Sequence, residues 1–228
     1  MSSAQPIDFS MILASSVHDM KNSLSMLLGT LEQFSGSCTG ACAATGKIDQ
    51  LHYLGQRLSG DLVQLLTLYK IQHQQYSPNI DEYDVADFLQ ECIAMHEPVL
   101  RSRGMAITVE CPADVQGYFD RDMIASIINN VINNACKYAQ KHVRVAGAAS
   151  DGYTLITVDD DGAGYPEHML QQSGEETRPI NVRTGSTSLG LYFAALIARA
   201  HTNKGRSGSI RCSNDAAGGG GRFSLYLP

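Results

Sequence analysis

The chain contains the stretch Asn130-Val131-Ile132-Asn133-Asn134-Ala135-Cys136-Lys137-Tyr138 at the end of a strongly helical segment that begins at Asp122. Its apolar residues recur with helical spacing and share one wide face: Ile124, Ile127, Ile128, Val131, Ile132 and Ala135. On the polar side, Asn130 and Asn134 lie one turn apart, and Lys137 follows. Two amides beside an ammonium group suit a hydrated magnesium ion that bridges phosphate oxygens. An amphipathic helix with an asparagine-rich polar side explains the pattern equally well.

Strand and helix patterns surround this helix from residue 79 to the C-terminus. The expected strands are Ala106–Glu110, a short one near Tyr118-Phe119, Val143–Ala146, Tyr153–Val158, Ser209–Cys212 and Arg222–Leu227. One helix is expected from an N-cap at Asp84 to about Arg101, ended by Gly104, and another from about Leu189 to Ala200. This segregation predicts an α+β fold, an α/β sandwich with helices on one face of a mixed sheet.

The N-terminal third has a coiled-coil pattern instead. Apolar residues alternate by steps of four and three at Leu13, Val17, Met20, Leu24, Leu27, Leu31 and Phe34. After a loop, Gly36–Lys47, a second heptad series contains Ile48, Leu51, Leu58, Leu62, Leu65 and Tyr69, with Gly55 in one core position. These patterns predict an antiparallel helical hairpin that pairs with a second copy into a four-helix bundle, hence a homodimer. The pattern stops at Ser77-Pro78-Asn79, so the expected domains are residues 1–78 and 79–228.

The first heptad series also contains the run His18-Asp19-Met20-Lys21-Asn22. His18 falls beside the apolar seam, and Asn22 lies one turn later on the same outward face. An imidazole that faces solvent on a rigid helix, next to a carboxylate, is placed to react with a group delivered from outside the helix.

Two glycine-containing segments follow the central helix. Val158-Asp159-Asp160-Asp161-Gly162-Ala163-Gly164-Tyr165-Pro166 ends a strand in an acidic turn. A carboxylate there can accept a hydrogen bond from an exocyclic amine such as that of adenine, and the glycines let the backbone approach a flat base. Most acidic turns with glycines, however, have no ligand and only reverse the chain. Thr184-Gly185-Ser186-Thr187-Ser188-Leu189-Gly190-Leu191 leads into a helix, whose N-terminal N–H groups favour phosphate. Walker-type and dinucleotide-type glycine spacings are both absent, which excludes those nucleotide-binding folds.

Composition narrows the class of protein further. The 228 residues have a net charge of −6, with 43% hydrophobic and 18% charged residues, as in ordinary globular proteins. The acidic balance argues against a nucleic-acid partner, and no apolar run reaches the roughly 20 residues of a membrane helix. The N-terminus lacks a signal-peptide pattern, so a cytoplasmic protein with reduced thiols is expected. Among six cysteines only Cys38 and Cys42 are close together, as a metal or redox pair or, more simply, as part of a loose loop.

These segments together resemble the catalytic core of a sensor histidine kinase, over nearly the whole chain. The phosphoacceptor box of the family is matched by His18-Asp19-Met20-Lys21-Asn22, and its asparagine box by Asn130–Tyr138. The first glycine box is matched by Asp160–Gly164 and the second by Gly185–Leu191. The family's closing strand resembles Gly221–Pro228. Four boxes in order, at suitable spacing, make the resemblance specific. It implies a dimerisation and histidine-phosphotransfer hairpin followed by an ATP-binding domain of the GHKL type.

The resemblance also implies roles for the matching residues. His18 would receive the γ-phosphoryl group of ATP, with Asp19 orienting its ring and Asn22 positioning water for dephosphorylation of the partner. Asn134 and Asn130 would hold Mg²⁺, Lys137 would meet phosphate, and Asp160 would read adenine. The other matching nucleotide-binding positions are Tyr138, Gly162, Gly164, Gly185, Thr187, Leu189 and Gly190. The implied partner is a response regulator, whose receiver aspartate accepts the phosphoryl group.

Some positions depart from the family pattern. Ser23 stands where proline is frequent, Ser188 stands where the second glycine box normally has glycine, and the usual aromatic-rich box is absent between Pro166 and Gly185. Asn130 occupies the position at which ATP-hydrolysing relatives have a glutamate, which favours phosphoryl transfer over hydrolysis. Two functions remain: an active histidine kinase, or a catalytically inactive or phosphotransfer-only dimeric module that binds a receiver domain or another kinase.

Overall fold

The computed structural model describes Met20, Ser23, Met26 and residues 41–94, 96–170, 186–216 and 218–228. The chain forms two compact units, Met1–Tyr76 with Asn181–Leu189, and Ser77–Ile180 with Gly190–Pro228. Several sequence-predicted site residues lie outside the described residues: His18, Asp19, Asn22 and Gly185. No helix in the described part of the chain has both the length and the apolar composition needed to cross a membrane.

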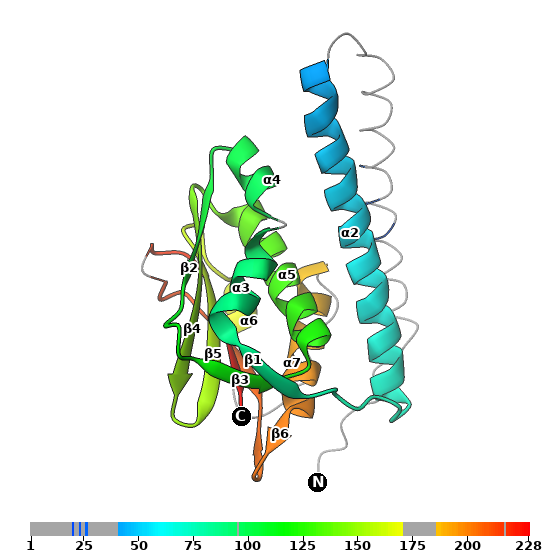
Figure 1. Ribbon diagram of the computed structural model, residues 1–228, viewed down its shortest axis with the longest axis vertical. Coiled ribbons are helices and arrows are strands. Elements are labelled where there is room, and N and C mark those ends of the chain that lie inside the picture. Colours follow the sequence, from blue (N-terminus) through cyan, green and yellow to red (C-terminus); the bar gives the residue numbers. More distant parts are fainter. Residues whose placement is uncertain are drawn as a thin grey trace. The chain divides into compact units, whose positions relative to one another are not determined.

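In the first unit, the long helix α2 covers Ala41–Gln72 (Figure 1). It begins inside the segment that was expected to be a loop, so that expectation is wrong for residues 41–47. The high helix propensity of alanine, which occurs three times in the first turn of α2, accounts for the earlier start. Two expected core residues, Leu62 and Tyr69, are 44% and 43% exposed in the single chain, whereas Leu54 and Leu68 are buried.

The described part of the second unit contains a five-stranded sheet, two two-stranded sheets and the helices that alternate with their strands along the chain (Figure 1). Its elements are β1 (Asp81–Asp84), α3 (Val85–Ala94), α4 (Glu97–Ser102), β2 (Ala106–Glu110), β3 (Gln116–Phe119), α5 (Arg121–Tyr138), β4 (His142–Ser150), β5 (Tyr153–Asp160), α6 (Glu167–Leu170), α7 (Ser186–Ala200, in this unit from Gly190), β6 (Thr202–Asn203), β7 (Arg206–Ser207), β8 (Ser209–Ser213) and β9 (Arg222–Leu227).

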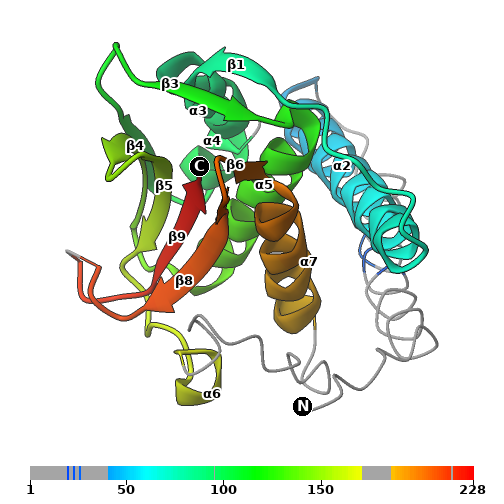
Figure 2. The same cartoon turned by 90° about the horizontal axis from the view of Figure 1, so that it is seen from below.

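The larger sheet has five strands in the order β2-β4-β5-β9-β8. Strands β2 and β4 are parallel, and every other neighbouring pair is antiparallel. Helices α3, α5 and α7 lie on one side of this sheet (Figure 2). The expected mixed sheet with helices on one face is therefore confirmed. The dimeric four-helix bundle stays a prediction, because one chain is described.

Several local expectations were wrong. The helix expected from Asp84 to Arg101 is two helices, because Pro98 lies in the first turn of α4 and could not donate a hydrogen bond within a continuous helix. Asp84 does cap α3, since its Oδ1 accepts from the Asp87 N–H at 2.9 Å, but it also ends a strand that the sequence did not reveal. That strand, β1, pairs with β3, and the short elements α6, β6 and β7 were also missed.

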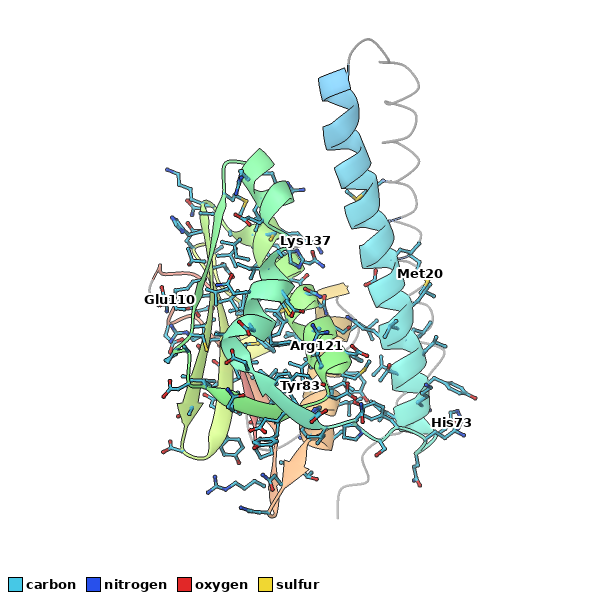
Figure 3. All side chains as sticks on the ribbon, viewed as in Figure 1. Met20, His73, Tyr83, Glu110, Arg121 and Lys137 are labelled. Atoms are coloured by element: carbon cyan, nitrogen blue, oxygen red, sulfur yellow. The ribbon has the colours of Figure 1, made fainter. Side chains whose placement is uncertain are left out.

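Helix α5 supplies the centre of the core. Asp120 caps its N-terminus, since its Oδ1 accepts from the Met123 N–H at 3.2 Å. The apolar residues expected to share one face are all buried: Ile124, Ile127, Ile128, Val131, Ile132 and Ala135. Burial of each Ile or Val side chain contributes about 1.5–3 kcal/mol, so this face anchors the helix firmly. Arg121 and Lys137 mark its two ends in Figure 3.

His201 joins the end of α7 to the start of α5. Its Nδ1 donates to the carbonyl of Ile197 at 2.8 Å, and its Nε2 accepts from the Asp120 N–H at 2.9 Å. These two bonds require a neutral ring with the proton on Nδ1. Burial lowers the pKa of the His201 imidazole below its ordinary value, against the smaller opposing effect of its bond to Ile197.

We expect the free energy of unfolding to fall as the pH drops below about 6.5, the ordinary histidine pKa. In this range the unfolded chain takes up a proton before the folded chain does, so acid favours unfolding. Urea unfolding at pH 7.5, 6.5 and 5.5 measures how steeply the free energy of unfolding falls with pH. His201→Gln should reduce this slope, and the exposed control His73→Gln should leave it unchanged. An identical slope in wild type and His201→Gln would contradict the assignment. Some slope remains in His201→Gln, because burial also lowers the pKa of His96.

Candidate functional site

Strand β5 ends in three consecutive aspartates that point to different surroundings. Asp159 lies on the face of the sheet opposite the core, in register with Arg144 on β4 and Arg222 on β9. Its carboxylate accepts from Arg144 Nη2 at 2.7 Å and from Arg222 Nε at 2.8 Å. Burial alone would raise the pKa of the Asp159 carboxyl, but the bonds from the two arginines outweigh it and lower the pKa. Asp159 therefore fastens three strands together.

Asp160 faces the other way, toward the helices. Its Oδ1 accepts from the Gly162 N–H at 2.8 Å and more weakly from the Gly221 N–H at 3.5 Å. Burial raises the pKa of this carboxyl, and the two backbone bonds oppose the rise. Among the described residues, no donor is bonded to its other oxygen, Oδ2, which lies 3.1 Å from the Cβ position that a side chain at Gly221 would have. Asp160 thus presents a half-buried acceptor next to glycine backbone.

Asp161 ties the same turn to the end of α5. Its Oδ1 accepts from the backbone N–H groups of Gln140 and Lys141 at 2.8 and 3.1 Å. The carbonyl of Tyr138 lies 2.4 Å from the position of a Cβ at Gly162, so only glycine fits there. The acidic turn and the C-terminal end of the asparagine-bearing helix are therefore held side by side.

A second glycine segment, after β8, closes over the acidic turn. A Cβ at Gly220 would lie 2.1 Å from the carbonyl oxygen of Asp160 and 2.6 Å from the nitrogen of Gly162. Both neighbours are backbone atoms, so a side chain at Gly220 would force the turn apart. The run Gly218–Gly221 was not assigned to the site from the sequence, where only Gly221 was noted, as the start of the closing strand. Four consecutive glycines were the available signal.

The polar side of α5 lies against α7 at Gly190. A Cβ at Gly190 would lie 1.9 Å from Nδ2 of Asn130, so the absence of a side chain at Gly190 makes room for this amide. Asn134 accepts from Lys137 Nζ at 3.4 Å, and Tyr138 is 60% exposed. The structure therefore brings Asn130 together with Gly190.

The remaining predicted site residues are only partly described. Gly164 adopts a φ of +78°, which favours glycine. Leu189 is buried, and Thr187 lies in the first turn of α7 without a described side chain. Among the described residues, no group of three or more His, Cys, Asp or Glu side chains could hold a metal ion.

Comparison with a family model adds a second line of evidence. Residues 119–228 match the family described as "Histidine kinase-, DNA gyrase B-, and HSP90-like ATPase". The match includes α5, the acidic turn at the end of β5, α7 and the glycine run before β9.

Individual relatives agree with this match. The chain is 25% identical over 178 residues to the sensor-like histidine kinase SenX3 of Mycolicibacterium smegmatis, covering 75% of this chain and 45% of the relative. It is 32% identical over 155 residues to the signal transduction histidine-protein kinase AfsQ2 of Streptomyces coelicolor, covering 65% and 26%. The chain thus spans less than half the length of these relatives. The structure of the Acinetobacter baumannii histidine kinase AdeS has the same fold, with a TM-score of 0.61 and 18% identity, over 92% of this chain and 96% of that chain.

Proposed function

Because the chain carries a histidine kinase catalytic core with a GHKL-type ATPase domain in residues 119–228, we propose that it autophosphorylates His18 from Mg-ATP. The phosphoryl group then passes to an aspartate in the receiver domain of a response regulator, and Asn22 serves the reverse, dephosphorylating reaction by positioning water. Residues 1–78 act as the dimerisation and phosphotransfer domain, and residues 79–228 as the catalytic domain.

The observation that carries this proposal is the environment of Asp160. Its Oδ2 is oriented beside glycine backbone, while Oδ1 is held by the Gly162 N–H. A carboxylate in such a place can accept a hydrogen bond from the exocyclic amine of adenine, and the adjacent glycines allow a flat base to come close. Guanine has a carbonyl at the corresponding position, so the carboxylate would repel it.

The phosphate side of the site also fits the proposal. Mg²⁺ prefers oxygen ligands and retains several waters, so amide oxygens together with phosphate oxygens and water suit it. Asn134 and Asn130 would contribute amide oxygens, and Lys137, now bonded to Asn134, would turn to a phosphate oxygen. Bound Mg-ATP supplies the transferable phosphoryl group together with neutralisation of the phosphate charge.

The residues of the hairpin perform the transfer. A ring nitrogen of His18 attacks the γ-phosphorus while the bond to the β–γ bridging oxygen breaks, and ADP leaves with that electron pair. Asp19 accepts a hydrogen bond from the other ring nitrogen, which orients the imidazole and stabilises the positive charge it gains. Position 130 holds an amide, which is a poor base for activating water, so transfer to a side chain is favoured over hydrolysis.

The surface of α2 supports a dimer. Leu62, Leu66 and Tyr69 follow one another at helical spacing and are 44%, 60% and 43% exposed. A stripe of large apolar side chains on a long helix is typical of a surface that packs against another helix. A second copy of the hairpin would cover this stripe and complete a four-helix bundle.

Substitution of His18 by alanine should remove essentially all phosphorylation of the chain by ATP. The expected loss, at least about a hundredfold, follows from the absence of any other nucleophile in the proposed step. Incubation with γ-labelled ATP and magnesium, followed by tests of acid and alkali stability, identifies phosphohistidine. His142→Ala is the matched control, because His142 is an exposed histidine outside the proposed site.

Two results would reject the kinase assignment. One is equal labelling of wild type and His18→Ala. The other is an unlabelled wild type that still binds nucleotide, which would favour the catalytically inactive or phosphotransfer-only module.

A further inference from the structure

Asn214, in the loop after β8, bonds to Tyr165 in the acidic turn, although the two residues are 49 positions apart in the sequence. Asn214 Oδ1 accepts from the Tyr165 N–H at 2.7 Å, and Asn214 Nδ2 donates to the Tyr165 carbonyl at 2.9 Å. The amide thus satisfies both backbone groups of one residue, as a neighbouring strand would. Both bonds are exposed to solvent.

Gly164, the residue before Tyr165, lies against the same Asn214 amide. A Cβ at Gly164 would lie 2.7 Å from Asn214 Oδ1, and Gly164 has a φ of +78°. The space that a side chain at Gly164 would need is therefore filled by Asn214. The positive φ favours glycine at this position, and a Cβ there would press on the Asn214 amide.

The Tyr165 ring and Asp160 share Gly221 as a neighbour. A Cβ at Gly221 would lie 2.9 Å from Cε2 of Tyr165 and 3.1 Å from Oδ2 of Asp160. The edge of the ring and the carboxylate oxygen thus both border the space that a side chain at Gly221 would fill. Holding the backbone of Tyr165 therefore limits where its ring can lie relative to the acceptor that would meet adenine.

We propose that Asn214 is a positioning residue for the nucleotide base. By clamping the Tyr165 backbone, it holds the Gly164 turn and the tyrosine ring in the arrangement in which Asp160 Oδ2 can accept from an exocyclic amine. This inference rests on the proposed function, since it assumes that an adenine nucleotide binds at Asp160. It adds a residue that acts through the Tyr165 backbone.

The clamp should affect binding more than folding. Without the amide, the exposed N–H and carbonyl groups of Tyr165 can bond to water, so the folded state loses little. A turn that is free to move must instead be ordered when the ligand binds, and that ordering weakens affinity. The substitution therefore separates a positioning role from a purely structural one.

The test compares wild type with Asn214→Ala in the full 228-residue chain by calorimetric titration of a non-hydrolysable ATP analogue with magnesium. We expect about tenfold weaker binding, equivalent to the loss of one or two hydrogen bonds, and a smaller preference for the ATP analogue over its GTP counterpart. Hydrogen exchange at the Tyr165 amide should become faster in the nucleotide-free variant. Asn214→Asp keeps the acceptor but loses the donor, so its affinity should lie between those of wild type and Asn214→Ala.

Asp215→Ala is the matched control in the same loop. Its carboxylate accepts from the Ser213 hydroxyl and, among the described residues, bonds to none of the acidic turn, so affinity should stay at the wild-type value. Unchanged affinity and base preference in Asn214→Ala would overturn this inference while leaving the proposed function intact. Equal weakening by Asp215→Ala would overturn it as well. A wild-type chain that binds neither analogue would overturn the proposed function, and this inference with it.

Discussion

Asp160→Asn is expected to weaken binding of adenine nucleotides by about a hundredfold, or about 2.7 kcal/mol, which lies in the upper part of the range for a hydrogen bond to a charged group. The asparagine can keep the bond from the Gly162 N–H through its carbonyl oxygen. Its NH₂ group would then occupy the position of Oδ2 and would confront the exocyclic amine with another donor. A site built to bond a polar group discriminates strongly when that bond fails.

Calorimetric titration of a non-hydrolysable ATP analogue into wild type and variant measures this effect. Asp151→Asn is the matched control at the other end of β5, where the φ of 51° is well tolerated by asparagine. Because burial raises the pKa of the Asp160 carboxyl, wild-type affinity should also fall as the pH drops toward that raised value. Equal affinities of wild type and Asp160→Asn would contradict the adenine-binding role of Asp160, on which the proposed function depends.

Asp159→Ala is expected to lower the free energy of unfolding by about 2–3 kcal/mol, less than the 3–5 kcal/mol of a fully buried pair because the two arginines are partly exposed. The Asp159 side chain is 5% exposed, and it bonds to Arg144 and Arg222, whose side chains are 34% and 27% exposed. Its removal leaves two neighbouring guanidinium groups without their shared partner, and their repulsion acts on three adjacent strands.

Urea unfolding of the two proteins at pH 7 measures this difference. Glu110→Ala is the control, because Glu110 contributes one exposed ion pair to Arg144 and should change stability by less than about 1 kcal/mol. Glu110 lies on the same side of the sheet, away from the helices (Figure 3). Since the folded state lowers the pKa of Asp159, its contribution is complete above about pH 4, the ordinary carboxyl range, and is lost as the pH falls further. Comparable losses in both variants would show that the bridging carboxylate has no special role.

The three aspartates illustrate how much of the site the sequence could specify. The role of Asp160 toward adenine came from the resemblance of Asp160–Gly164 to the first glycine box and stays a proposal. That Asp160 lies on the core side of β5 and Asp159 on the opposite side followed from the period-two alternation of the strand. The partners of Asp159 did not, because Arg144 and Arg222 come from strands whose register is set by the whole sheet. The clamp by Asn214 was missed for the same reason.

The sequence by itself determined the elements whose pattern is local and periodic. The apolar face of α5 is buried as expected and β9 spans the expected residues, because these features follow from spacing along a single segment. The mixed sheet with helices on one face followed from the order of strands and helices along the chain. Only the tertiary structure decided which backbone segments approach one another. Gly220 lies against Asp160, Gly190 against Asn130 and Asn214 against Tyr165 because the strand order brings together residues far apart in the chain. Such contacts depend on packing in three dimensions, and spacing along the sequence carries no record of it.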